Sequence, residues 1–148
     1  MTNFFIFLTL IIVVIVGYKL VQRYRRIQKI AKEYETFKKV LVVEDFFPDI
    51  FTRTLSGKVK LLIAQSIEEA TQLFNANPDI DIIIMDACVP GNELNTVPLV
   101  QLFRKTFTGP IITASSVNEY NFALLEAGCS HNGYSKEGAA KTVLNLIK

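Results

Sequence analysis

The chain has 148 residues and a mass of 16.7 kDa, enough for one domain with a sizeable core and a short appendage. Half of the residues are hydrophobic and the mean hydropathy is +0.30, while the only two cysteines, Cys88 and Cys129, are too few for a disulfide framework or a cysteine metal cluster. The formal net charge of +2 hides a basic stretch at 19–39 and an acidic remainder, in which eight basic side chains face twelve acidic ones. This acidity argues against direct binding of nucleic acid.

The N-terminus predicts a membrane anchor. From Phe4 to Val16 every residue except Thr9 is strongly apolar, which favours a transmembrane helix over residues 1–18. No Lys or Arg precedes this run and no small-residue cleavage site follows Gly17, so we expect an uncleaved anchor rather than a secretory signal. Basic residues crowd the far side, which predicts a single-pass protein of the cytoplasmic membrane with its N-terminus outside and the rest in the cytoplasm. A buried hairpin helix is the alternative.

Residues 19–38 predict a basic connector helix, because they contain no proline and lie where anionic membrane lipid would attract them. Leu20, Tyr24, Ile27, Ala31 and Tyr34 follow the four-and-three spacing of a coiled-coil seam, which would allow a homodimer. A solvated connector is the favoured interpretation, since a stable seam usually needs three or four heptads.

Residues 39–148 alternate between apolar runs typical of strands and amphipathic stretches typical of helices. Such alternation predicts an α/β domain with a five-stranded, doubly wound parallel sheet. The expected strands are 40–43, 59–64, 80–85, 110–112 and 130–136, the last being the most polar. The expected helices are 46–55, a stretch from Ser66 that closes before Pro78, 98–107, 116–127 and a C-terminal one with Ala140 to Ile147 on its face.

Two helices carry a capping-box pattern at their expected start. Ser66 stands three residues before Glu69, and Ser116 stands three residues before Glu119. In such a box the hydroxyl and the carboxylate satisfy free backbone amides in the first turn. The pattern therefore predicts a helix start at each serine.

Acidic residues follow two of the expected strands directly. Glu44 and Asp45 come after the 40–43 run, and Asp86 comes after the 80–85 run. If these strands are neighbours, their carboxyl ends bring three carboxylates to one crevice, where like charges need a hard cation such as Mg²⁺ between them. Thr113 and Lys136 follow near two further strand ends, which completes a candidate phosphoryl-acceptor group.

These residues resemble those of a response-regulator receiver domain, over Lys39 to Lys148. The resemblance implies that Glu44 and Asp45 are the acidic pair and that Asp86 is the phosphorylated aspartate. Asp86 is followed four residues later by Pro90, as in that family, which implies the backbone carbonyl of Cys88 as a further Mg²⁺ ligand. The same resemblance gives Thr113, followed by Ala114, as the hydroxyl switch residue and Lys136 as the phosphate-binding lysine.

The function implied by this resemblance is that of a membrane-tethered phosphoacceptor rather than an enzyme. Its expected partners are a histidine kinase or phosphotransfer protein as donor and an output protein of unknown identity. Self-phosphorylation from small donors with Mg²⁺ and slow self-dephosphorylation would accompany that role.

The chain departs from the family pattern in its readout region. Val89 stands in place of the usual Met, Glu93-Leu94 in place of an Asp-Gly pair, and Glu137 in place of the Pro after the lysine. The loop from Gly128 to Lys136 is one residue longer than usual, so Gly133 takes the place of the aromatic switch, with Tyr134 beside it. These changes keep open a pseudo-receiver, a membrane-anchored scaffold that does not use phosphate.

Other interpretations of the same residues stay open. Glu44 and Asp45 would also suit the first turn of a helix, Asp86 a loop cap, Thr113 an ordinary strand and Lys136 a solvated surface. His131 is expected to be a solvated loop residue rather than a ligand or phosphodonor. A metal-dependent phosphohydrolase is disfavoured, because Cys88 stands where its signature requires a second aspartate.

Overall fold

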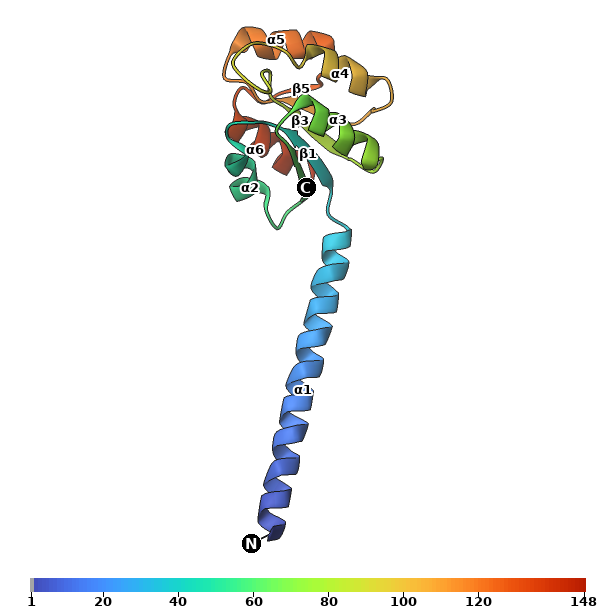
Figure 1. The fold of residues 1–148 in the computed structure, drawn as a ribbon, viewed down its shortest axis with the longest axis vertical. Helices are drawn as coiled ribbons and strands as arrows, with labels where there is room; N and C mark the ends of the chain where they lie inside the picture. Colours follow the sequence, from blue (N-terminus) through green and yellow to red (C-terminus); the bar gives the residue numbers. More distant parts are fainter. Residues whose placement is uncertain (1) are drawn as a thin grey trace. The chain divides into compact units, whose positions relative to one another are not determined.

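A computed structural model describes the backbone of residues 2–148 and the side chains of residues 13–148. The chain divides into two units, one ending at Thr36 and one from Phe37 to Lys148. The first unit is a single helix, α1, over Thr2–Glu35, which runs without a break from the segment predicted as the anchor into that predicted as the connector and ends three residues before residue 38 (Figure 1). Within the described part of the chain, no helix meets the length and hydropathy needed to cross a membrane. The predicted anchor over 1–18 lies mostly outside the described side chains.

The second unit alternates strands and helices as predicted (Figure 1). The strands are β1 Lys39–Val43, β2 Lys60–Ala64, β3 Ile82–Met85, β4 Ile111–Thr113 and β5 His131–Asn132. The helices are α2 Pro48–Leu55, α3 Ile67–Ala76, α4 Val97–Arg104, α5 Asn118–Ala127 and α6 Lys136–Leu146. All strand pairs are parallel and their order is β2-β1-β3-β4-β5, so the predicted five-stranded doubly wound α/β sheet is confirmed.

Alternating side chains of the strands build two cores, one on each face of the sheet. Leu41 and Val43 of β1 pack on the face covered by α3, α4 and α5, whereas Val40 and Val42 pack on the face covered by α2 and α6. All four are fully buried, as expected of a parallel strand covered on both faces. This two-sided burial fixes the register of β1 and therefore the position of the residues that follow it.

The predicted helix starts are confirmed in one case and wrong in another. The Ser66 hydroxyl accepts a hydrogen bond from the Glu69 amide, so the predicted serine cap forms, while the Glu69 carboxylate accepts from the amide of Gln65, one residue before the cap. The second box does not form, because α5 begins after Val117 and has no side-chain cap. The Ser115 hydroxyl instead accepts a hydrogen bond from the Val117 amide.

The end of the domain also differs from the prediction. The expected strand over 130–136 is reduced to His131–Asn132, and α6 begins at Lys136, where the Ser135 hydroxyl caps the Gly138 amide at 3.0 Å. A serine cap satisfies a free amide of the first helical turn, which favours helix over strand from this point. Lys136 is thus at a helix start rather than a strand end.

Candidate functional site

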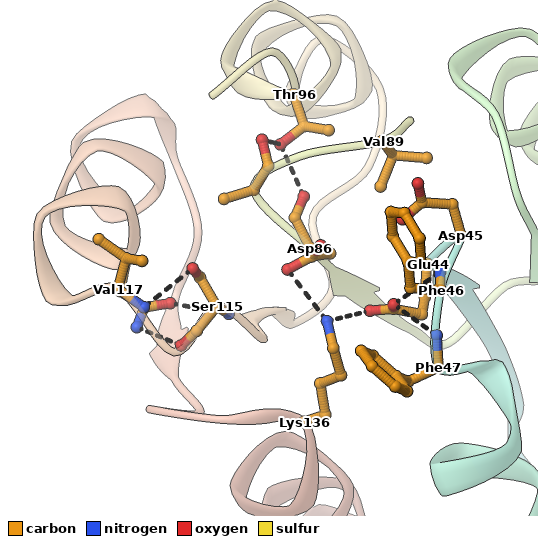
Figure 2. A network of polar contacts seen from close by, with 12 residues as sticks. Glu44, Asp45, Phe46, Phe47, Asp86, Val89, Thr96, Ser115, Val117 and Lys136 are labelled. Carbon is orange, nitrogen blue, oxygen red and sulfur yellow. Dashed lines mark hydrogen bonds and ion pairs between the residues drawn. The ribbon is translucent and has the colours of Figure 1, made fainter. Parts of the chain in front are cut away.

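Three carboxylates meet at the carboxyl edge of the sheet, as predicted. Val43 and Met85, the last residues of β1 and β3, are direct register partners, so the residues after them emerge side by side. Glu44, Asp45 and Asp86 each place one carboxylate oxygen within 4.8 Å of the others. Figure 2 shows these side chains facing a common space together with Lys136. The sequence prediction that the three acids converge is confirmed.

Glu44 is held rigidly beneath this space. Its side chain is 1% exposed, and its Oε1 accepts hydrogen bonds from the Phe46 amide at 3.1 Å and the Phe47 amide at 2.9 Å. Its Oε2 pairs with the Lys136 ammonium (Figure 2). A buried carboxylate with three donors of this kind is held in one position at the floor of the site.

Asp45 has an oxygen atom with no partner. Its Oδ2 accepts a hydrogen bond from the Gly91 amide at 3.0 Å, but its Oδ1 is buried and receives no hydrogen bond from the described residues. A buried anionic oxygen without a donor is costly, and a cation removes that cost. This atom therefore fits a metal ligand.

Asp86 and Lys136 lie next to each other in the site. The Asp86 Oδ1 lies 3.4 Å from the Lys136 Nζ, and the side chain of Asp86 is only 12% exposed. Burial raises the pKa of Asp86 above its usual value, against the opposing effect of Lys136, and the nearby Glu44 raises it further. Without a bound cation, the surroundings of Asp86 therefore destabilise its charged form.

This raised pKa predicts a pH dependence of stability. Because folded Asp86 holds its proton to a higher pH than unfolded Asp86, its contribution to the free energy of unfolding declines as pH rises from about 3.8 through the folded pKa. We expect Asp86→Asn to remove this decline and to stabilise the metal-free chain at pH 7. Urea unfolding in the presence of a chelator, repeated between pH 4 and 7, measures it. A pH profile parallel to that of the unsubstituted chain would contradict the assignment.

Cys88, whose carbonyl the family resemblance implies as a ligand, lies at the same site. The residue lines the same cleft as Glu44, Asp86 and Lys136, and among the described residues none donates a hydrogen bond to this carbonyl. Carboxylate and carbonyl oxygens are the donors that Mg²⁺ takes in proteins. Glu44, Asp45, Asp86 and the Cys88 carbonyl thus offer a donor set that fits Mg²⁺, and the orphaned Asp45 oxygen is the observation that supports it.

Thr113 does not join this group. It is fully buried, its hydroxyl donates to Asn132 Oδ1 of β5 at 3.1 Å and it accepts from the Gly133 amide at 3.3 Å. The register explains this placement, because Thr113 pairs with Met85, one residue before Asp86. Only a residue that lies further along the chain than Thr113 can therefore reach the site.

Ser115 carries a hydroxyl group at the cleft that the sequence analysis did not consider. It is 5% exposed and lines the cleft of about 210 Å³ with Asp86 and Lys136 (Figure 2). Asn121, fully buried in α5, pairs with both polar groups of its backbone: Oδ1 accepts from the Ser115 amide at 3.2 Å and Nδ2 donates to its carbonyl at 2.7 Å. In an extended chain alternate residues point to the same side, so Thr113 and Ser115 share one side. Which of them reaches the cleft depends on its distance from the end of the strand, and this spacing was the signal that the sequence offered.

Comparisons with known proteins bear on the fold. No protein-family model matches the chain, and no curated protein matches it. Among solved structures, a two-component response regulator from Clostridium difficile is similar, with 17% identity and a TM-score of 0.62, over 75% of this chain and 93% of that one. A CheY-like receiver domain from Methylobacillus flagellatus matches with 16% identity and a TM-score of 0.61, over 76% and 100% of the two chains. The Vibrio cholerae chemotaxis protein CheY4 matches with 20% identity and a TM-score of 0.60, over 76% and 97%.

The domain has the receiver fold. At these identities the likeness shows the fold alone. This fold agrees with the observed strand order. The acidic cluster itself lies at the carboxyl edge of the sheet, where open α/β sheets hold their ligands.

The loop before Lys136 is constrained by a close contact with β4. A Cβ atom at Gly133 would lie 2.3 Å from the Thr113 carbonyl oxygen, so the close passage of the two segments requires glycine there. Tyr134, with a φ of 60°, is 70% exposed. Gly133 is thus fixed by the space available, and the aromatic ring of Tyr134 beside it points to solvent. His131 lies in β5, half-buried, with its Nδ1 2.8 Å from the Ser130 hydroxyl.

Proposed function

We propose that this chain is a phosphoacceptor, which takes a phosphoryl group onto Asp86 from the phosphohistidine of a histidine kinase or phosphotransfer protein. The observation that carries the proposal is Asp86 itself, a nearly buried carboxylate beside a lysine and two further acids at the sheet edge. A carboxylate oxygen of Asp86 attacks phosphorus, the bond from phosphorus to the histidine nitrogen breaks, and its electron pair stays on the imidazole. The product is an acyl phosphate on Asp86.

The surrounding side chains would position the phosphoryl group. Lys136 already lies between Glu44 and Asp86, so its ammonium is placed to pair with a phosphoryl oxygen. Ser115, rather than Thr113, lines the cleft beside Asp86. Its hydroxyl can donate a hydrogen bond to another phosphoryl oxygen. Bound Mg²⁺ would supply positive charge that offsets the negative charge of the transferred group.

The test is chemical labelling of the full-length chain with a small acyl phosphate and Mg²⁺. We expect a labelled species that is sensitive to hydroxylamine, as an acyl phosphate is, and that is lost in Asp86→Asn. Asp49→Asn, which removes a carboxylate of α2 outside the cluster, is the matched control and should keep the label. Label that persists in Asp86→Asn, or no label from any donor, would overturn the proposal.

A second candidate is a scaffold that keeps the receiver fold without using phosphate. The exposed Tyr134 and the glycine at position 133 favour it, because no aromatic side chain occupies the position expected for the switch. If Asp86→Asn and a phosphate mimic both leave the affinity for the output protein unchanged, the scaffold is supported. A large change in that affinity would exclude it.

We further propose that residues 1–18 tether the domain to the cytoplasmic membrane, with the N-terminus outside. The apolar run from Phe4 to Val16 supports this, and Val13 to Val16 of α1 leave about half or more of their surface exposed. We expect the chain to stay in the membrane pellet after alkaline extraction, and Val14→Lys to release it. Ile27→Lys, in the basic connector, is the control. Recovery of the unsubstituted chain in the supernatant would contradict the tether.

A further inference from the structure

Two adjacent residues at the start of α4 hold the segment that carries Asp86. This segment, residues 86–90, follows β3 and forms no helix or strand, so its backbone groups need partners from elsewhere. Asn95 and Thr96 supply most of them. We call these two residues the clamp.

Thr96 bonds the beginning of the segment. The residue is fully buried, and its Oγ1 donates to the carbonyl of Asp86 at 2.7 Å and lies 3.1 Å from that of Ala87 (Figure 2). The Ala87 carbonyl also accepts from the backbone amides of Asn95 at 3.0 Å and Thr96 at 3.3 Å. The backbone of the acceptor aspartate is thereby fixed through its own carbonyl.

Asn95 bonds the end of the same segment. Its Oδ1 accepts from the Val89 amide at 2.8 Å, and its Nδ2 donates to the carbonyls of Val89 at 3.1 Å and Pro90 at 3.3 Å. The side chain of Asn95 therefore uses both its acceptor and its donors on this one stretch of backbone.

The clamp satisfies every carbonyl of the segment except one. Those of Asp86, Ala87, Val89 and Pro90 accept from Asn95 or Thr96, while that of Cys88 has no donor among the described residues. Cys88 is 9% exposed and lines the cleft. A carbonyl left without a donor in such a place is open to a cation, and its direction is set by the bonds on either side.

We infer that Asn95 and Thr96 are positioning residues, which hold the Cys88 carbonyl and Asp86 in place for a divalent cation. The inference rests on the proposed function, since it assigns these residues to the same site. Neither touches the reacting atoms. They act through the backbone of residues 86–90.

The test compares Mg²⁺ binding by the full-length chain and its variants, measured by calorimetry and by the backbone amide signal of Gly91. We expect Thr96→Val and Asn95→Ala to weaken Mg²⁺ affinity about tenfold, the lower end of effects seen when residues that orient metal ligands are removed. Thr96→Ser keeps the hydroxyl and should stay within about twofold of the unsubstituted chain. Thr71→Val is the matched control, because it removes a threonine hydrogen bond to the Ile67 carbonyl within α3.

A second readout needs no metal. Hydrogen exchange of the Val89 amide, which donates to Asn95 Oδ1, should be faster in Asn95→Ala than in the Thr71→Val control.

If Thr96→Val fails to fold, Asn95→Ala decides, since Asn95 is partly exposed and at the surface of the loop. Unchanged affinity in a folded Asn95→Ala chain, or equal losses in Thr96→Val and Thr96→Ser, would overturn the inference. Absence of Mg²⁺ binding by the unsubstituted chain would instead remove the proposed function, and the clamp with it.

Discussion

Replacing Lys136 by methionine is expected to lower the free energy of unfolding by about 3 kcal/mol at pH 7, because it leaves buried carboxylates without their cation. The Lys136 ammonium pairs with Glu44, which is 1% exposed, and lies 3.4 Å from Asp86. Methionine keeps the length and packing of the side chain but removes the charge. Urea unfolding in a metal-free buffer measures the change.

The control for this prediction is Lys141→Met, an exposed lysine of the same helix, α6. It should change stability by less than about 0.5 kcal/mol, as surface substitutions usually do. Adding Glu44→Gln to Lys136→Met should recover part of the loss, because the unpaired buried charge is then gone. A loss for Lys136→Met no greater than for Lys141→Met would show that the ion pairs contribute little to the fold.

The acidic cluster could be predicted from the sequence because its position depends on strand ends alone. Val40–Val43 and Ile82–Met85 are fully apolar runs that must be buried on both faces, and an acid directly follows each. Parallel neighbours bring their carboxyl ends together, so Glu44, Asp45 and Asp86 meet whatever the loops do.

The hydroxyl of the site could not be placed in the same way. β4 has only three residues, so its end is hard to locate from the sequence. The Thr113-Ala114 pair resembles the family motif, and this resemblance favoured Thr113 over Ser115 as the hydroxyl of the site. The register with β3 puts Thr113 level with Met85, below the site, and Ser115 reaches it. Lys136 lies beside the acidic cluster, but at the start of α6 rather than near a strand end, and Ser135 before it offered a helix-capping signal.

The clamp and the role of Asn121 lay beyond sequence reasoning for a different reason. Asn95 and Thr96 bond a segment five to ten residues away through loop geometry, and Asn121 bonds the backbone of Ser115 from within a helix. Asparagine and threonine are common in loops and turns without such partners, so the residue types alone do not indicate the contacts. Two pairs of segments around the cleft are thus joined by side chain to backbone hydrogen bonds that no periodicity predicts.

Mg²⁺ at a concentration one hundred times its dissociation constant is expected to raise the free energy of unfolding by about 2.7 kcal/mol, because a ligand that binds only the folded chain stabilises it by mass action. A cation at this site would give the Asp45 Oδ1 the partner it lacks and would offset the repulsion between the three carboxylates. Thermal unfolding of the full-length chain with MgCl₂, against NaCl at equal ionic strength, measures the effect.

Asp45→Asn should lose most of this gain in stability, since a neutral amide replaces a charged ligand. The control is Asp79→Asn, which changes a carboxylate paired with Lys39 outside the cluster and should keep the gain. Equal stabilisation of the Asp45→Asn and unsubstituted chains would place the bound ion elsewhere, and would leave the buried Asp45 oxygen without the role that its surroundings indicate.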